Sequence, residues 1–348
     1  MKTIVLTGGG TAGHCLPNIA LLPYLKKYFD NIVYIGGDGI EKTIATEHNL
    51  TYYQIPTVKL QRKFTFKNFA VPFKLLKNII TTKKILKSIS PSVIFSKGGY
   101  VSLPVILAGN SLSIPCVTHE SDLTIGLSNK IMAKKCEYVF TSFESTAKAL
   151  PNGVFVGSPI RNSLFYQDKQ SALKRFNLSG NKPVILVTGG SSGSLAINLA
   201  LDKALDKLLE KYDIIHLCGK GKQKRPSKTG YTCLEYLNQM EMAFCASDIV
   251  VTRGGSNALF ELIALSKPML VIPLPKDNSR GDQIQNAKYF EERGLCKVLL
   301  QENLTSNSLI FNLNELYSHK QKYINALATY PMKKANYEIS SLLNKISK

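Results

Sequence analysis

One arrangement of residues occurs twice in this chain and restricts its fold more than any other feature: an apolar strand, a glycine-rich loop and a helix. Near the start, the predicted strand Thr3–Leu6 leads into the loop Gly8–His14. About 180 residues later, the predicted strand Pro183–Thr188 leads into Gly189–Ser194. Strand–loop–helix units that follow one another are typical of parallel sheets covered by helices. The repetition predicts two domains, each built around such a sheet.

Apolar runs of strand length alternate with helical segments along the rest of the chain. The further predicted strands lie at 31–35, 91–95, 115–118, 137–141, 154–156, 213–217, 249–252, 269–272 and 296–299. The last predicted helices lie at 312–327 and 333–348. The predicted fold class is therefore α/β, with two Rossmann-like domains that face each other across a cleft.

The domain boundary is predicted where a glycine and a proline interrupt this alternation, in the segment Gly157–Arg161. Such a segment is typical of a linker, since both residues favour turns over helices and strands. We expect residues 1–157 to form the first domain and 158–332 the second. We expect the helix at 333–348 to pack back on the first domain. At 348 residues, the chain is long enough for two cores.

The apolar runs and the cysteine pattern predict a cytoplasmic protein. No apolar run approaches the roughly 18 residues that a membrane-spanning helix needs. The first six residues run directly into glycines, without the apolar core of a signal peptide. The seven cysteines are scattered without a Cys-x-x-Cys pair. We therefore expect reduced, buried thiols and no metal site.

The charge balance predicts an anionic partner. Lys and Arg number 44, Asp and Glu 24, and the net charge is +20. This favours nucleic acid, an anionic membrane or a phosphorylated substrate as the partner. The excess is concentrated in segment 57–90, which holds nine basic residues and no acidic one. A non-catalytic module that binds nucleic acid or membrane is thus one alternative for the function.

Segment 57–90 also interleaves apolar side chains with the basic ones. On a helix, Leu75, Ile79, Leu86 and Ile89 share one face, away from most of the lysines. The pattern predicts an element on a membrane surface, where apolar side chains enter the lipid and lysines meet phosphates. The alternative is a surface helix whose apolar stripe packs on its own domain. Three aromatic residues before the helix are harder to explain as core: Phe64, Phe66 and Phe69.

The segment Val250–Leu262 predicts a nucleotide site. A β-branched strand ends at Arg253, two glycines follow, and a helix begins near Ser256. Glycines allow close approach of the backbone, and N–H groups at a helix start attract phosphate. Glu261 lies about one and a half turns into this helix, where its carboxylate can accept from ribose hydroxyls. The alternative is an ordinary strand–helix turn with a surface glutamate.

The first glycine loop supports more than one interpretation. Gly8, Gly10 and Gly13 fit the G-x-G-x-x-G fingerprint of dinucleotide-binding proteins, which makes an NAD(P)-dependent oxidoreductase an alternative. The fingerprint also needs an acidic residue closing the second strand, and here that strand ends in two glycines. His14, at the mouth of the loop, has the side chain of a general base near neutral pH. Alternatively, it caps the helix.

Two further polar loops, Gly98–Ser102 and His119–Asp122, each follow a predicted strand. Open α/β sheets bind ligands at the carboxyl ends of their strands, so both loops are predicted to face a ligand. The alternative for His119 and Glu120 is a structural pair that ties two loops together. In the linker, Arg161 could reach a phosphate or be solvated.

Seven motifs of this chain resemble, in order, those of the MurG family of peptidoglycan N-acetylglucosaminyltransferases. They are Gly9–His14, Gly98–Ser102, His119–Glu120, Gly157–Arg161, Gly189–Gly193, Arg253–Gly255 with Glu261, and Gln283 with Asn286–Ala287. Each motif alone has little specificity, but seven in register over nearly the whole chain are specific. The resemblance implies two Rossmann-like domains of the glycosyltransferase B type.

The resemblance also implies a reaction. It is the transfer of N-acetylglucosamine from UDP-N-acetylglucosamine to the 4-hydroxyl of N-acetylmuramyl-pentapeptide on undecaprenyl diphosphate, which converts lipid I to lipid II. The anomeric centre would be inverted by direct displacement, without a covalent intermediate. The partners would be the sugar nucleotide, lipid I and the anionic inner leaflet, contacted through 57–90 at the cytoplasmic face of the cell membrane. No nucleic acid, metal or other cofactor is expected.

For the donor, the resemblance assigns residues of the second domain. Glu261 would hold the uridine ribose, Leu237 would contact uracil and Gln283 would contact the sugar. Ser191 would hold the diphosphate together with a helix start. The residues of that helix start are Ser256, Asn257, Ala258 and Leu259, and the next residue, Phe260, is also assigned to substrate binding.

For the acceptor, the resemblance assigns His14 as the base, with Glu120 and Asp122 behind it as polar support. Arg161 would line the cleft together with part of the first glycine loop. The loop residues are Thr11, Ala12 and Gly13.

Some positions depart from the commoner family pattern. Ala12 stands where glycine is usual, Ser158 replaces an asparagine, and Asp282 stands where Gln or His is frequent. Ser121–Asp122 stands where Gln-Asn is common, and a carboxylate near a sugar phosphate is less favourable than an amide. A glycosyltransferase of the same fold with another lipid acceptor, such as a diacylglycerol glucosyltransferase, is the nearest alternative.

Overall fold

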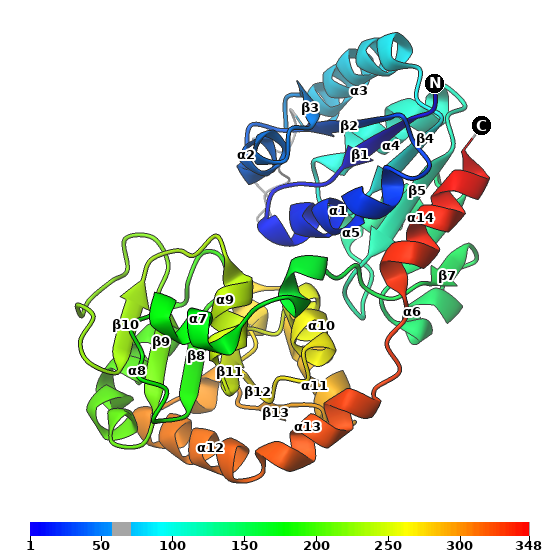
Figure 1. Cartoon of the computed structure of the whole chain (residues 1–348). Coiled ribbons are helices and arrows are strands. Elements are labelled where there is room, and N and C mark those ends of the chain that lie inside the picture. Colours follow the sequence, from blue (N-terminus) through cyan, green and yellow to red (C-terminus); the bar gives the residue numbers. More distant parts are fainter. Residues whose placement is uncertain (58–70, 348) are drawn as a thin grey trace. The chain divides into compact units, whose positions relative to one another are not determined.

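The computed structural model describes residues 1–57 and 71–347. The chain divides into two compact units, Met1–Arg161 with Lys333–Lys348, and Asn162–Met332, each with its own sheet (Figure 1). The boundary predicted after residue 157 lies a few residues before this division. Within the described ranges, none of the helices is both long and apolar enough to cross a membrane.

A seven-stranded parallel sheet forms the centre of the first unit, in the order β3-β2-β1-β4-β5-β6-β7. Its strands are β1 (Thr3–Thr7), β2 (Asn31–Gly36), β3 (Thr51–Gln54), β4 (Val93–Ser96), β5 (Cys116–Glu120), β6 (Tyr138–Thr141) and β7 (Gly153–Phe155). The chain order reverses beside β1, and open sheets bind ligands next to such a point. The loops after β1, β4 and β5 share that edge of the sheet.

Helices cover both faces of this sheet. They are α1 (Ala12–Leu25), α2 (Ile40–Glu47), α3 (Val71–Ile89), α4 (Ser102–Ser111), α5 (Leu127–Ala133), α6 (Glu144–Lys148) and α14 (Ala335–Ile346). Side chains alternate along β1, so Ile4 and Leu6 pack in a core with α1 and α14, while Val5 packs in another with α3 and α4. Ile339 and Leu343 of α14, drawn in red in Figure 1, belong to the first of these cores.

The second unit repeats this topology with a six-stranded parallel sheet, in the order β10-β9-β8-β11-β12-β13. Its strands are β8 (Val184–Thr188), β9 (Asp213–Leu217), β10 (Tyr231–Leu234), β11 (Ile249–Thr252), β12 (Met269–Val271) and β13 (Lys297–Val298). Its α-helices are α7 (Lys169–Arg175), α8 (Leu195–Leu209), α9 (Met240–Ala246), α10 (Ser256–Ala264), α11 (Asp282–Glu291), α12 (Ser306–Ser318) and α13 (Lys320–Thr329). Short 3-10 helices are η2 (Asn162–Phe165), η3 (Lys276–Asn278) and η4 (Gln301–Asn303). Two parallel α/β units, predicted from the repeated strand–loop–helix pattern, are confirmed.

The C-terminal helices differ from the prediction. The predicted single helix at 312–327 is wrong, because α12 and α13 meet at His319. Helix α12 also begins earlier, since Thr305 Oγ1 accepts from Ser308 N at 3.0 Å and Ser308 Oγ accepts from Thr305 N at 2.8 Å. This reciprocal capping usually involves Glu or Gln at the second position, and the serine hides it in the sequence.

Candidate active site

The loop after β1 makes a tight turn that packs against the first turn of α1. Gly10 has a φ of +85°, and a Cβ atom on Gly8 would lie 2.4 Å from the carbonyl oxygen of His14. Glycine is therefore needed at both positions. The Gly8 carbonyl also accepts a hydrogen bond of 2.7 Å from the hydroxyl of Tyr34 on β2. These contacts fix the turn from which α1 begins, after Thr11.

A buried carboxylate from α2 accepts from one N–H group of this loop and from one of the loop after β2. Glu41 is 1% exposed, and its Oε2 accepts from Gly10 N at 3.2 Å while its Oε1 accepts from Gly37 N at 3.1 Å. In a dinucleotide-binding protein, the pyrophosphate approaches the backbone at this loop. Here the anionic side chain of Glu41 already lies there and would repel it. The structure thus argues against the oxidoreductase alternative.

His14 lies in the first turn of α1, half-buried, with Nδ1 3.2 Å from the hydroxyl of Thr11. Thr11 makes no side-chain cap on the helix, so its hydroxyl meets the imidazole instead. The ring also lies against the loop after β4, since a Cβ atom on Gly99 would lie 3.2 Å from His14 Nδ1. The loops after β1 and β4 therefore meet at this imidazole.

Lys97, directly after β4, is 1% exposed and contacts the loop after β5. Its Nζ is 2.7 Å from His119 Nδ1 and donates to Ser121 Oγ. His119 Nε2 is 2.9 Å from the carbonyl oxygen of Gly157, which can only accept. Nε2 therefore carries the proton and Nδ1 accepts from Lys97. These contacts link Ser121, in the loop after β5, through Lys97 and His119 to Gly157, two residues after β7.

Burial shifts the pKa values of Lys97 and His119. It lowers the pKa of Lys97 to about 7, against the opposing effect of the Glu120 and Asp122 carboxylates. Burial, together with the charge of Lys97, also holds the pKa of His119 well below its ordinary value, so the imidazole is neutral. His119 is thus part of a structural link, as the alternative for this residue predicted.

The carboxylate of Glu120, which is 4% exposed, shapes the loop after β5. Its Oε1 accepts from Asp122 N at 3.0 Å, and its Oε2 accepts from Gly126 N and Asn129 Nδ2, both at 2.8 Å. Burial, followed by the nearby Asp122 carboxylate, raises the pKa of Glu120. Both oxygens are engaged in holding the loop that carries the half-buried Asp122.

In the second unit, Arg253 joins the loops after the paired strands β8 and β11. Its Nη2 donates to Ser194 Oγ at 2.5 Å and to Gln301 Oε1 at 2.8 Å. Its Nη1 donates to the carbonyl oxygens of Ile272 and Pro273 at 3.0 and 3.3 Å. Ser194 in turn caps α8. Arg253 therefore fixes the end of β12 and the start of α8 beside the start of α10.

The glycine loop after β8 presents Ser191 at the surface. Gly190 and Gly193 have φ values of +82° and +67°, and a Cβ atom on Gly193 would lie 2.0 Å from the Cys218 carbonyl oxygen. The loop therefore packs directly on the one after β9. Helices α8 and α10 begin at this edge, where their first N–H groups point out of the helix ends. The edge is suited to bind an anion such as a diphosphate.

Side chains of helix α11 hold the backbone of Gly254, in the loop between β11 and α10. Gln283 Oε1 accepts from Gly254 N at 3.2 Å and from Leu274 N at 3.0 Å, and Asn286 Nδ2 donates to Gly254 O at 3.1 Å. A Cβ atom on Gly254 would lie 2.4 Å from the Gln283 carbonyl oxygen. The amide oxygen of Gln283 is thus engaged with backbone, which orients its Nε2 group.

The remaining predicted donor residues are spread over the same sheet edge. Glu261 is half-buried in the second turn of α10, and Leu237, which follows β10, is 9% exposed. Leu237 lines a hollow of about 450 Å³ with Arg175, Tyr236, Asn238 and Gln239. The side chains of Leu259 and Phe260 are buried in the core. Of those two residues, only the backbone is left to meet a ligand.

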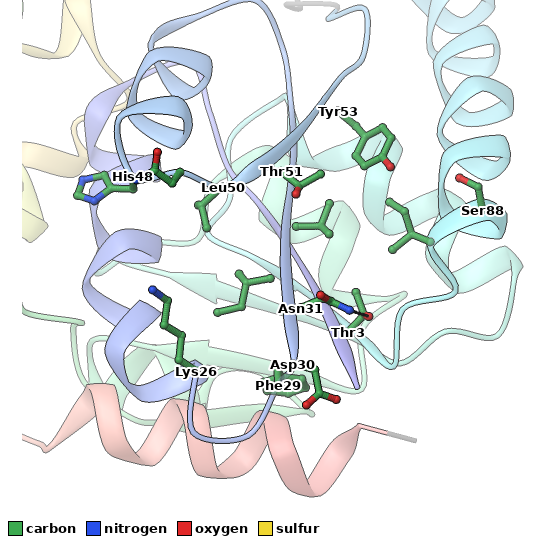
Figure 2. Close-up of a pocket in the computed structure, with 14 residues that line it drawn as sticks. Thr3, Lys26, Phe29, Asp30, Asn31, His48, Leu50, Thr51, Tyr53 and Ser88 are labelled. Atoms are coloured by element: carbon green, nitrogen blue, oxygen red, sulfur yellow. Dashed lines mark hydrogen bonds between the residues drawn. The ribbon is translucent and has the colours of Figure 1, made fainter. Parts of the chain in front are cut away.

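A second hollow of similar size lies away from these loops. It has a volume of about 480 Å³ and includes Thr3, Asn31 and Thr51, the first residues of β1, β2 and β3 (Figure 2). These are the amino ends of the strands, whereas the glycine loops follow the carboxyl ends. We therefore do not assign the candidate site to this hollow.

Comparison with known proteins identifies the family of this chain. Residues 4–141 match the family model of the glycosyltransferase family 28 N-terminal domain, and residues 184–343 match that of its C-terminal domain. The chain belongs to glycosyltransferase family 28. A fold with two parallel α/β units and glycine loops at the strand ends is thus that of a glycosyltransferase, as the motifs predicted.

Its relatives within family 28 match it over the full length. A Clostridium botulinum (strain Hall) protein is 43% identical over 354 residues, with 100% of both chains covered. A Lachnospira eligens protein is 44% identical over 330 residues, with 93% of both covered. Each is named UDP-N-acetylglucosamine--N-acetylmuramyl-(pentapeptide) pyrophosphoryl-undecaprenol N-acetylglucosamine transferase. The resemblance to this group, drawn from seven motifs, is confirmed.

Solved structures share the family 28 fold at low sequence identity. MurG of Acinetobacter baumannii has a TM-score of 0.73 at 23% identity, with 99% of this chain and 100% of that chain covered. The UDP-GlcNAc 2-epimerase of Methanocaldococcus jannaschii has a TM-score of 0.65 at 16% identity, with the same coverage. At these identities the likeness concerns the fold alone.

The contacts of three residues of this family 28 chain were not predicted from the sequence, and two of them, Glu41 and Lys97, were not named as candidates at all. In the sequence, Glu41 has the neighbours of an exposed residue on a surface helix, and Lys97 has those of a solvent-exposed lysine in a loop. Arg253 was noted within its motif, but its contacts reach residues up to 59 positions away. No local pattern signals such contacts, because the sheet topology creates them.

Proposed function

We propose that the chain transfers N-acetylglucosamine from UDP-N-acetylglucosamine to the 4-hydroxyl of undecaprenyl-diphosphate-linked N-acetylmuramyl-pentapeptide, with inversion. The full-length relatives named for this transfer support the proposal. The observation that carries it is the pair of helix starts after β8 and β11, joined through Arg253 and Ser194. This pair provides a preorganised electropositive end for a leaving diphosphate.

On the donor side, we assign the diphosphate to Ser191 and to the backbone at the start of α10, from Ser256 to Phe260. Glu261 would accept from the uridine ribose, and Leu237 would contact uracil. Gln283 would offer its Nε2 group to the sugar, since its oxygen is held by Gly254 N and Leu274 N. Charge that develops on UDP as the sugar leaves would be stabilised without protein rearrangement.

On the acceptor side, we assign His14 as the general base. Its Nε2 would take the proton of the acceptor 4-hydroxyl. For this, Nδ1 must carry the ring hydrogen and donate it to Thr11 Oγ1, 3.2 Å away. The acceptor oxygen then bonds to the anomeric carbon, the bond from that carbon to the β-phosphate oxygen breaks, and its electron pair leaves with UDP. Thr11, Ala12, Gly13 and Arg161 would line the acceptor side. Asp122 is assigned as polar support, positioned by Glu120.

We also infer that α3 contacts an anionic membrane at the cytoplasmic face. The predicted stripe of Leu75, Ile79, Leu86 and Ile89 packs on the core of its own unit, as the alternative of an ordinary surface helix predicted. A second stripe is exposed: Phe73 is 77%, Leu76 57% and Ile80 50% exposed. Four exposed lysines accompany it: Lys74, Lys77, Lys84 and Lys87. Phe64, Phe66 and Phe69, also predicted to enter lipid, lie outside the described residues.

Calorimetric titration of the purified protein with UDP-N-acetylglucosamine, UDP-glucose and NADH tests the donor assignment. We expect the N-acetylglucosamine nucleotide to bind best, and Glu261→Ala to weaken it about ten- to hundredfold, the effect of losing a hydrogen bond to a charged group. Glu241→Ala, on the neighbouring helix α9, is the matched control. Binding of NADH without binding of the UDP-sugars would overturn the proposal.

A further inference from the structure

The basic loop between β9 and β10 is held by contacts with α8 and with the strand ends. Arg225 Nε lies 2.5 Å from Asp202 Oδ1, and Lys228 Nζ lies 2.8 Å from Asp206 Oδ1. Gly221 N donates to Glu235 Oε1 at 2.9 Å. Exposed ion pairs contribute little singly, but these contacts act together on one short segment. The loop therefore holds Lys222, which lies between its attachment points, in a defined place.

Lys222 extends from this loop onto the glycine loop before α8. Its Nζ donates to the carbonyl oxygen of Ser192 at 2.7 Å and lies 3.4 Å from that of Gly193. The backbone supports the same contact, because Gly193 packs against the Cys218 carbonyl and the Cα of Gly219. The ammonium group thus lies on the loop that carries Ser191, and it is half-exposed.

Three other cationic side chains near this loop, those of Arg253, Arg225 and Lys228, are engaged in other ways. The guanidinium of Arg253 makes its contacts within the protein, and Arg225 and Lys228 face the carboxylates of Asp202 and Asp206. The ammonium of Lys222 has three N–H donors and faces two carbonyls, which leave its charge unneutralised. An anion bound over residues 189–194 would meet that charge.

We propose that Lys222 is a further donor-binding residue, whose ammonium contacts the diphosphate of the sugar nucleotide above the glycine loop 189–194. The proposal rests on the proposed function, which places the diphosphate at this loop. In this role Lys222 would oppose the negative charge that grows on the β-phosphate as the bond to the sugar breaks. It would add a full charge to the partial charges of the helix ends.

Binding of UDP, UMP and uridine separates a diphosphate contact from a general effect on the loop. For Lys222→Met, we expect UDP to bind about ten- to hundredfold more weakly. The affinity for UMP should fall less, and the affinity for uridine should be unchanged. Lys222→Arg should retain most of the UDP affinity, and the effect of Lys222→Met should shrink as salt rises. Lys224→Met, an exposed position two residues on, is the control and should behave as wild type.

Equal weakening of UDP and uridine in Lys222→Met would overturn the inference, because it would show that the residue only shapes the loop. Unchanged UDP affinity would overturn it as well. If the wild-type protein bound neither UDP nor its sugar, the proposed function itself would fail, before any variant is compared.

Discussion

The guanidinium of Arg253 donates a hydrogen bond of 2.5 Å to the hydroxyl of Ser194, and this contact joins the loops after β11 and β8. The same hydroxyl accepts from Ile197 N and so caps α8. One side chain thus sets the two helix starts relative to each other before any ligand binds. In a preorganised site, the protein groups need little rearrangement when charge develops on the ligand, so little free energy is lost.

Replacing Arg253 with lysine should disturb this arrangement, because one ammonium group cannot reach both Ser194 and the carbonyl of Ile272 as the planar fork does. We expect UDP affinity to fall about tenfold and the midpoint of thermal unfolding to fall by a few degrees. Calorimetry and melting curves measure the two effects. Arg280→Lys, which changes an ion pair between the exposed Arg280 and the partly buried Asp282, is the control. Full UDP affinity in Arg253→Lys would refute the role given to it.

The second prediction concerns the buried carboxylate of Glu41. Glu41→Gln should replace one accepting oxygen with an N–H₂ group that faces a backbone N–H, at Gly10 or Gly37. We expect the free energy of unfolding to fall by about 2 kcal/mol, the scale of a lost hydrogen bond to a charged group. Denaturant unfolding measures this, with the exposed Glu47→Gln on the same helix as control. Equal stabilities for the two variants would contradict the account.

The third prediction follows from the pKa of Lys97, which burial lowers to about 7 from an ordinary value of 10.5. Between these values the unfolded chain holds a proton that the folded protein lacks, so folding becomes more favourable as pH rises. Relative to Lys97→Met, the free energy of unfolding of the wild type should rise by about 1.4 kcal/mol per pH unit from pH 7 to 10.

Denaturant unfolding of both proteins across that range checks the slope. The groups facing Lys97 are His119, Ser121, Glu120 and Asp122. Burial and the charge of Lys97 hold the pKa of His119 well below its ordinary value, so this imidazole is neutral across the range, and Lys97→Met removes only the lysine. Parallel stability curves for wild type and Lys97→Met would show that the ammonium is not desolvated.

The fourth prediction tests His14. His14→Gln should lower kcat by about a hundred- to ten-thousandfold, the range for loss of a general base, and should remove the acidic limb of the pH–rate profile. Affinity for UDP should be unchanged, because His14 lies in the first unit and the donor residues in the second. His48→Gln, at the exposed end of α2, is the control. Retention of the acidic limb in His14→Gln would exclude this imidazole as the base.

Much of the fold follows from local sequence. Strand–glycine–helix boundaries at Thr7–Ala12 and Thr188–Leu195 reflect β-branched runs and glycines whose effects act over a few residues. The short edge strands β3 and β10, of four residues each, were missed because so little apolar pattern marks them. The functional context of Glu41 and Lys97 was missed for another reason. A charged residue becomes buried only when elements distant in sequence enclose it.

The measurement that tests the central claim most directly is transfer from labelled UDP-N-acetylglucosamine to purified lipid I, with analysis of the product linkage and of the UDP released. The account predicts one UDP for each disaccharide formed, an inverted anomeric centre and linkage to the 4-hydroxyl. It predicts no transfer to diacylglycerol. Transfer to diacylglycerol in place of lipid I, or release of UDP without disaccharide, would contradict it.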